Sequence, residues 1–463
     1  MIRIDSELTP ASLLPRIERM WEASAQGLNS IRRSWDPNRG SPVFTVDGRY
    51  TAQGWTEWTQ GFLFGSEVLQ FDATGEQQSL ESGRESTVGL MAPHVSHIGV
   101  HDHGFNNVST YGNLRRLMLE GRIPHDQREL QFYELGLKIS GAVQAARWST
   151  TIDGDGYIYS FNGPHSLFSD TIRSLRALAL AHQLGHRLMG ENDAPISLLD
   201  RLIQHARSTA RYNVYYGDGR DVYDVSGRVV HESIFNTNDG RFRCPSTQQG
   251  YSPFTTWTRG LAWIILGYAE QLEFVQALSD ADFEPFAGRR EVESMMRRAA
   301  TAAADFYLQH TPTDGVPYWD AGAPGLVHLG DYLDRPADPI NDYEPVDSSA
   351  AAIACQGLLR LGSCLADDDD VSAARYHAAG LTVLNTLLQE PYLCTDTDHQ
   401  GLLLHSVYHR PRGWDHIPEG RRIPCGESCL WGDYHLREAA LLVQRLANDD
   451  PYYTFFGPEA DAD

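Results

Sequence analysis

Apolar residues recur at helical spacing along almost the whole chain of 463 residues. Such a pattern predicts an amphipathic helix wherever it is sustained over several turns. No Gly/Ser-rich or Pro-rich linker separates the segments, and no strict repeat is present. About twelve segments carry the pattern, at 13–25, 55–71, 78–91, 107–120, 129–147, 170–188, 196–211, 257–278, 290–309, 347–365, 373–390 and 431–448.

This series of helices predicts an all-α fold in which helical hairpins close into one toroid, a single domain over residues 1–463. Such a ring buries its inner helices and leaves a cavity at one end. A right-handed solenoid of helix pairs is the alternative, but a more regular repeat would be expected of it. Function commonly resides in loops on a rigid scaffold. Four longer loops rich in Gly, Pro, Asp and aromatic residues are the candidates, at 148–168, 212–254, 312–345 and 392–429.

The charge balance excludes two classes of partner. Lys and Arg number 38 against 61 Asp and Glu, a formal net charge of −23. We therefore expect neither nucleic acid nor an anionic membrane surface as a partner. The sequence also has no leader pattern and no uncharged apolar run of about 18 residues. With six scattered cysteines, these features predict a soluble, cytoplasmic protein with free thiols.

Two acidic residues stand at the starts of predicted helices. Asp102 lies in the cluster His101-Asp-His-Gly-Phe105, and Asp170 begins the helix predicted from position 170. Each has a simpler explanation, as a helix cap or as a residue stabilised by the helix dipole. In a toroid, however, corresponding helix ends face one cavity. Two carboxylates there would repel each other, which can hold one proton between them and supply an acid and a base.

A second constellation surrounds Arg259. Trp257 and Trp263 flank this arginine, and Gln249 precedes it by ten positions. Aromatic rings can stack on a sugar while a guanidinium forks onto a carboxylate. Packing in the core would also explain the tryptophans. A charged residue and a glycine between them favour a binding site.

Taken in order, several segments resemble the unsaturated glucuronyl hydrolases, glycoside hydrolase family 88, and the related unsaturated rhamnogalacturonyl hydrolases. The resemblance runs from about residue 55 to 446, and Asp170 falls where the family has an acid at a helix start. The matching segments are Trp58-Thr-Gln-Gly-Phe62, His101-Asp-His-Gly-Phe105, Gln249-Gly-Tyr-Ser252, Trp257-Thr-Arg-Gly-Leu-Ala-Trp263, Val316-Pro-Tyr-Trp-Asp320, Asp347-Ser-Ser-Ala-Ala-Ala-Ile353 and Trp431-Gly-Asp-Tyr434.

The resemblance implies an (α/α)6 barrel and an enzyme that needs no metal or cofactor. Its substrate would be an oligosaccharide with a terminal Δ4,5-unsaturated uronyl residue, hydrated at the C4=C5 enol ether rather than attacked at C1. Asp170 would donate the proton and then orient or deprotonate water, while Asp102 would hold sugar hydroxyls and tune Asp170.

The remaining roles also follow from the resemblance. His101 would orient Asp102 or approach the uronate, which Arg259 and Gln249 would bind, and His231 would contact the substrate. Trp58, Trp257 and Trp263 would form aromatic walls. Phe161 stands where the family often has Trp, which implies a smaller wall. A monomer or a homodimer is expected.

Three alternatives stay open at this point. The chain could act as an unsaturated rhamnogalacturonyl hydrolase. It could be a sugar epimerase on the same toroid, although the Asp102 and Asp170 pair argues against a histidine-based mechanism. It could also be a non-catalytic carbohydrate-binding toroid. The sugar attached to the uronate and any sulfate preference are undecided; Arg410 and Arg412 are available for an anionic group.

Overall fold

The computed structural model describes residues 1–54 and 57–457. Each predicted segment is helical in it, which confirms the all-α prediction. The first two positions of the segment predicted from residue 55 lie outside the described residues. The helices are α1 (Pro10–Ser34), α2 (Gln60–Thr74), α3 (Gln77–Leu90), α4 (Ala92–Val95), α5 (His103–Asn107), α6 (Asn113–Leu119), α7 (Gln127–Ala146), α8 (Thr171–Ser174), α9 (Arg176–Gln183), α10 (Leu198–Tyr212), α11 (Thr258–Ala277), α12 (Arg289–His310), α13 (Ser348–Leu365), α14 (Asp370–Leu387) and α15 (Leu430–Ala447).

Two predicted helices are interrupted. A π-helical turn, η2 (Val108–Gly112), joins α5 to α6. The segment predicted at 170–188 is broken at Leu175 into α8 and α9 and ends at Gln183. Short 3-10 helices lie in the connections, at Pro37–Arg39, Glu191–Asp193, Asp280–Phe283, Pro324–Leu329, Tyr332–Asp334 and Arg410–Arg412.

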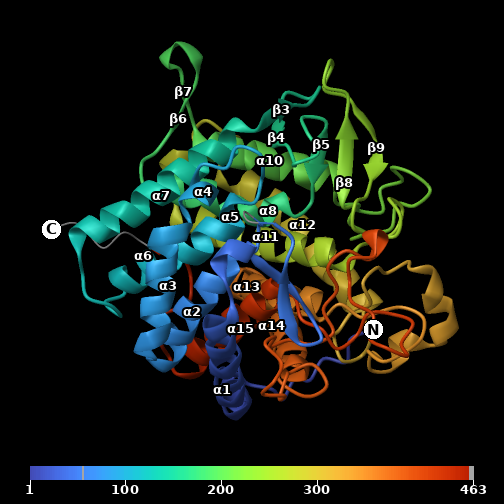
Figure 1. The fold of residues 1–463 in the computed structure, drawn as a ribbon. Helices are drawn as coiled ribbons and strands as arrows, with labels where there is room; N and C mark the ends of the chain where they lie inside the picture. The colour runs from blue at the N-terminus through green and yellow to red at the C-terminus, as the bar shows by residue number, and fades with distance from the viewer. Residues whose placement is uncertain (55–56, 458–463) are drawn as a thin grey trace.

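Within the described residues, six helical units form a closed inner ring (Figure 1). Around it, α2 contacts α5 and α6, α5 contacts α8 and α9, and these contact α11. The ring continues through α13 and α15, and α15 packs against α2. The outer helices α3, α7, α10, α12, α14 and α1 pack on this ring. Because α15 returns to α2, the fold is an (α/α)6 barrel and the solenoid alternative is wrong.

The inner and outer helices differ in how much of their surface is buried. The outer helix α1 buries one stripe of residues, such as Leu13, Ile17 and Met20, as expected for a helix with one face on the core. The inner helix α13 is buried on nearly all sides. Small residues let the inner helices approach closely: a Cβ at Gly357 of α13 would lie 2.7 Å from the backbone nitrogen of Leu266 in α11.

A group of four buried charged side chains, here called the core cluster, connects three inner units. Arg173 places Nη1 2.6 Å from Glu270 Oε2 and Nη2 3.1 Å from Glu438 Oε2. Arg176 Nη1 lies 3.8 Å from Glu270 and 3.7 Å from Glu438. None of the four side chains is more than 1% exposed. Two acids and two bases balance each other in this cluster, as buried charges require.

Short strands occupy the connections between helices, where sequence periodicity predicted no strands. Runs of two to five residues are too short for their alternation to be recognised. They are β1 (Pro42–Val46), β2 (Arg49–Ala52), β3 (Trp148–Thr150), β4 (Gly156–Ile158), β5 (Ser166–Phe168), β6 (Leu188–Met189), β7 (Pro195–Ile196), β8 (Glu232–Phe235) and β9 (Phe242–Ser246). In the antiparallel sheet β5-β8-β9, Phe168 pairs with Glu232. This pairing fixes the segments just before α8 and just after His231.

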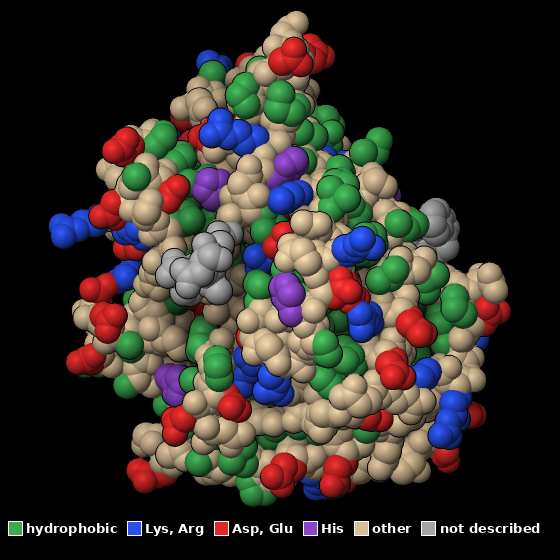
Figure 2. Space-filling view, turned by 90° about the vertical axis from the view of Figure 1, so that its left-hand side faces the viewer, with side chains coloured by type: hydrophobic (Ala, Val, Ile, Leu, Met, Phe, Trp, Pro, Cys, Tyr) green, Lys and Arg blue, Asp and Glu red, His purple; other side chains and the backbone are tan. Residues whose placement is uncertain are grey.

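The surface is of mixed character and the cysteines are unpaired. On the described part of the face shown in Figure 2, acidic, basic and histidine side chains are interspersed with apolar ones. Among the described residues, none of the helices is both long and apolar enough to span a membrane. All six cysteines are free thiols, as predicted, and five are buried.

Candidate active site

A cavity of about 410 Å³ opens at one end of the barrel. It is lined by residues at or just before the first turns of α2, α5, α8 and α11, so the N-terminal ends of these inner helices meet there. Helix N-termini carry partial positive charge and favour an anionic ligand. The lining residues are Gly54, Glu57, Trp58, Val100, His101, Asp102, Phe105, Phe161, Phe168, Asp170, Gln248, Gln249, Trp257, Arg259, Trp263, Tyr408, His409, Arg412 and Trp414.

His101, Asp102 and Asp170, here called the cavity cluster, lie together in this cavity. His101 Nε2 is 3.3 Å from Asp170 Oδ1 and 3.7 Å from Asp102 Oδ1. Because both neighbours are acceptors, Nε2 carries a proton. Asp102 and Asp170 occupy the N-cap positions of α5 and α8, yet neither side chain makes a capping hydrogen bond. The helix-cap explanation of Asp102 is therefore wrong.

Burial and charge act in opposite directions on the cavity cluster. Burial would raise the pKa of Asp170, but the hydrogen bond and charge of His101 hold it below its ordinary value. Burial raises the pKa of Asp102, with a contribution from Asp170 that opposes the effect of His101. Burial would lower the pKa of His101, but the two carboxylates raise it. These directions favour a protonated His101 beside an ionised Asp170.

The surrounding backbone fixes His101 in place. Its carbonyl oxygen accepts hydrogen bonds from Gln144 Nε2 at 2.9 Å and from Ser174 Oγ at 2.7 Å. Its ring stacks on Phe161, with centroids 6.1 Å apart. His103, by contrast, is turned into the protein, where it contacts Ser140 Oγ and the carbonyl of His97. This histidine supports the loop and does not line the cavity.

Arg259 lies in the cavity wall, but its guanidinium is already engaged. Nη1 pairs with Asp347 Oδ2 at 2.9 Å and also donates to the Val407 carbonyl. Nη2 donates to Gln249 Oε1 at 2.8 Å and to the Tyr408 carbonyl at 2.6 Å. A bidentate contact from Arg259 to a substrate carboxylate would break these bonds. The sequence suggested such a fork because it does not reveal internal partners.

Gln249 is the group that Arg259 presents to the cavity. Since Arg259 can only donate, the Gln249 oxygen must face it, and the Nε2 amide is left as a donor. The arginine thereby orients the amide and adds positive charge behind it. Arg259 thus positions Gln249, which lines the cavity.

His231 is buried behind the wall and does not itself line the cavity. Its Nδ1 accepts from the backbone nitrogens of Gln248 at 3.0 Å and Gln249 at 3.3 Å. Burial lowers the pKa of His231 to about 4, so the ring is neutral. It packs on Phe168 and Trp257, with centroids 4.4 and 4.7 Å away. In this position His231 shapes the Gln249 loop.

The predicted aromatic walls are all present in the cavity. Trp58 stacks on Trp431 with centroids 5.0 Å apart, and Trp257 and Trp263 are 4% and 2% exposed. Phe161 is 55% exposed at the mouth. Three of these rings are therefore fixed by packing, whereas Phe161 has open space in front of it. Rings of this kind can stack on the apolar faces of a sugar.

The chain was compared with protein families and with proteins of known function. No protein-family model matches the chain. An unsaturated glucuronyl hydrolase of Formosa agariphila is 27% identical over 392 residues, which are 84% of this chain and 80% of that protein. Another, of Bacillus sp. strain GL1, is 26% identical over 436 residues, 92% of this chain and 97% of that one. The chain is a relative of the unsaturated glucuronyl hydrolases.

The fold agrees with that of unsaturated glucuronyl hydrolases of known structure. The crystal structure of an unsaturated glucuronyl hydrolase specific for heparin matches with a TM-score of 0.71 and 19% identity. The match covers 95% of this chain and 100% of that one. It supports the same overall fold.

Several residues of the cavity were missed in the sequence. Glu57 is a third carboxyl in the wall, and burial raises its pKa to about 7. In the sequence, only its position next to Trp58 could have indicated that Glu57 belongs to the cavity. Tyr408, His409 and Trp414 come from the loop before α15, which was predicted to carry function without its residues being identified. Of the two arginines named from the sequence for an anionic group, Arg412 lines the cavity and Arg410 does not.

Metal-ligating side chains lie elsewhere. Within residues 1–54 and 57–457, the one group with ligand atoms close enough to hold a metal ion is Asp47, His416 and Glu427. None of these lines the cavity.

Proposed function

We propose that this chain is a glycosidase that removes the terminal Δ4,5-unsaturated uronyl residue from oligosaccharides produced by polysaccharide lyases. The observation that carries the proposal is the placement of two carboxylates beside His101 Nε2, inside an aromatic cavity at the N-terminal ends of four inner units. The curated relatives named unsaturated glucuronyl hydrolase support the same substrate class.

The proposed reaction is hydration of the C4=C5 bond. The ring oxygen makes this bond an enol ether, so protonation at C4 leaves positive charge shared between C5 and that oxygen. Water adds at C5 and loses its proton. The resulting hemiketal opens, and the sugar attached at C1 is released. Because C1 is not the reacting centre, the separation rule for retaining and inverting glycosidases does not apply.

Asp170 is the proposed proton donor, although its lowered pKa keeps it ionised in the free site. The raised pKa of His101 provides a store for the proton, 3.3 Å from Asp170 Oδ1. A uronate carboxylate entering nearby raises the pKa of Asp170 by charge repulsion. The proton can then move from His101 to Asp170 and on to C4. Asp170, ionised again, orients or deprotonates the water.

Asp102 has a different proposed role. Its pKa is raised by burial and by Asp170, and its side chain is 13% exposed to the cavity. It is placed to bind sugar hydroxyls. Its negative charge, when ionised, would also oppose the lowering of the Asp170 pKa by His101. The uronate carboxylate would meet the amide of Gln249, with Arg259 and the helix N-termini contributing positive potential.

The remaining parts of the proposal concern the wider protein. The enzyme would act as one catalytic domain in the cytoplasm, where its free thiols are kept reduced. It would use no catalytic metal, and as a monomer or homodimer it would bind an unsaturated uronyl oligosaccharide.

The experiment follows the ultraviolet absorbance of the conjugated enoate. The protein is incubated with unsaturated disaccharides from glycosaminoglycan, gellan, xanthan and ulvan, and with an unsaturated galacturonyl-rhamnose for the rhamnogalacturonyl alternative. At least one substrate should lose absorbance steadily, and Asp170→Asn should nearly abolish the loss. An unchanged signal with all five would contradict the proposal and favour a carbohydrate-binding protein.

A further inference from the structure

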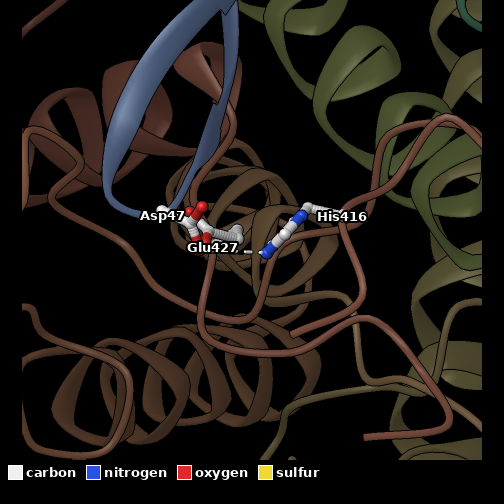
Figure 3. A group of neighbouring side chains, drawn as sticks. All are labelled: Asp47, His416 and Glu427. Atoms are coloured by element: carbon white, nitrogen blue, oxygen red, sulfur yellow. Dashed lines mark ion pairs between the residues drawn. The ribbon is translucent and has the colours of Figure 1, made fainter. Parts of the chain in front are cut away.

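A second constellation of ionisable side chains lies outside the cavity. Asp47 is at the tip of the β1-β2 hairpin, His416 lies in the loop after Arg410–Arg412, and Glu427 precedes α15. Figure 3 shows their side chains converging from these separate segments. One ligand atom from each lies within 4.8 Å of the other two. His416 Nε2 is 3.2 Å from Asp47 Oδ1.

Internal hydrogen bonding does not account for this arrangement. His416 Nε2 is buried and has no hydrogen-bond partner among the described residues. It is nevertheless aimed at two carboxylates, which repel each other unless a positive charge lies between them. The side chains of His416 and Glu427 are 22% and 14% exposed, and that of Asp47 is 85% exposed. An ion from solvent therefore has access from the Asp47 side.

Neighbouring groups that are not themselves proposed ligands orient the Glu427 carboxylate. Its Oε2 accepts a hydrogen bond from Thr45 Oγ1 and another from the Gly48 nitrogen at 3.3 Å. His399 Nε2 lies 3.6 Å away from the same oxygen. Within the described part of the chain, no hydrogen bond uses Oε1 of Glu427. Orientation of a ligating carboxylate by such outer partners is characteristic of metal sites.

We propose that Asp47, His416 and Glu427 bind a divalent transition-metal cation, for which Zn²⁺ is the best match. One imidazole and two carboxylates suit Zn²⁺ better than Mg²⁺ or Ca²⁺, which prefer oxygen ligands alone. Three protein ligands leave a position for water, and the ligand atoms are near enough to share one ion. His399 is not a fourth ligand, because its Nδ1 accepts from the Gly401 nitrogen at 2.9 Å and its Nε2 faces Glu427.

The cation would fix one wall of the catalytic cavity. Asp415, next to His416, accepts hydrogen bonds from the backbone nitrogens of Tyr408 and His409. Trp414 and Arg412 of the same loop line the cavity. An ion joining His416 to the β1-β2 hairpin therefore holds this loop against a rigid element. Its role is structural, and only its effect on KM rests on the proposed function.

Binding is tested on the full-length protein after treatment with a chelator. Calorimetric titration with Zn²⁺ should show one equivalent bound, and Co²⁺ should give a visible absorption band. His416→Gln and Asp47→Asn should each weaken the affinity by at least about tenfold. His125→Gln, at an exposed histidine whose ring pairs with Gln127, should leave the affinity unchanged. The proposal would be overturned if the wild type bound no Zn²⁺, or if both site variants bound it with the affinity of the wild type.

A second measurement addresses the loop. Saturating Zn²⁺ should raise the melting temperature of the wild type, because a ligand that binds only the folded state stabilises it. His416→Gln should lose this shift. In the absorbance assay, Zn²⁺ should lower KM and leave kcat unchanged; an effect on kcat alone would contradict a structural role. If no disaccharide is a substrate, the proposed function fails while the binding and melting results still decide the metal site.

Discussion

The cavity cluster and the core cluster are two buried ionic groups on neighbouring inner helices, and only one has the properties of an active site. Asp170 and Arg173 are three positions apart in the chain. The core cluster contains two acids and two bases, is at most 1% exposed and borders no described cavity. The cavity cluster contains two acids and one histidine and opens into a space of about 410 Å³.

Their electrostatics differ accordingly. In the core cluster, burial would raise the pKa of Glu438, but Arg173 and Arg176 hold it at about 2. Burial raises the pKa of Glu270, although Arg173 and Arg176 oppose this rise. The cluster still contains equal numbers of acids and bases in contact with one another. In the cavity cluster one histidine serves two carboxylates, so a proton remains shared and can be moved. A buried cluster whose charges neutralise each other thus indicates a structural role, whereas unbalanced charge beside an accessible cavity indicates chemistry.

The largest expected effect is on activity. Asp170→Asn should reduce kcat/KM by about a thousandfold or more, because it removes the group that transfers the proton. Its melting temperature should fall only modestly, since the change loses the interaction with His101 that lowers the Asp170 pKa but also removes repulsion with Asp102. The enoate absorbance assay and a thermal melt measure the two quantities. Activity within tenfold of the wild type would remove Asp170 from the chemistry.

The matching change in the core cluster should act on stability. Glu438→Gln leaves two buried arginines short of a partner, which should lower the free energy of unfolding by about 3–5 kcal/mol. Urea denaturation measures this loss. The folded fraction should keep kcat within a few fold of the wild type. A large loss of kcat without destabilisation would show that the core cluster takes part in catalysis.

Arg259 should show both effects, because it pairs with buried Asp347 and also orients Gln249. Arg259→Ala should lower the melting temperature and raise KM by about tenfold, as expected when binding common to ground and transition states is lost. Gln249→Ala is the control: it should raise KM similarly without loss of stability. If Gln249→Ala leaves KM unchanged, the amide does not contact the uronate.

The smallest expected effect is on the pH profile. The His101 pKa is raised above 6.5, so its proton is held below that pH and is lost as pH rises through the higher value. kcat/KM should therefore decline on the alkaline side. His101→Gln, which keeps a donor but cannot titrate, should remove this limb and also lower kcat. An unaltered alkaline limb in the variant would assign it to another group.

Helical periodicity was sufficient to predict about twelve helices and to favour a closed toroid, because long inner and outer helices carry sustained apolar patterns, and the family resemblance added the (α/α)6 barrel. The break at Leu175 and the strands β5, β8 and β9 were not predictable, since they depend on tertiary contacts over few residues. Asp102 and Asp170 could be brought together from sequence because both begin inner helices. The engagement of Arg259 by Asp347 and Gln249 could not, as those partners are distant in the chain. Glu57 and the loop carrying Trp414 lacked a distinctive pattern.

The proposed chemistry is tested most directly by running the reaction in deuterium oxide and examining early products by proton NMR. Protonation at C4 by Asp170 predicts one deuterium at C4 in a single stereochemical position, acquired as the enoate signal disappears and the second sugar is released. Asp170→Asn should show none of these changes at comparable times. Release of the sugar with the C4=C5 bond intact and C4 unlabelled would contradict hydration and indicate attack at C1.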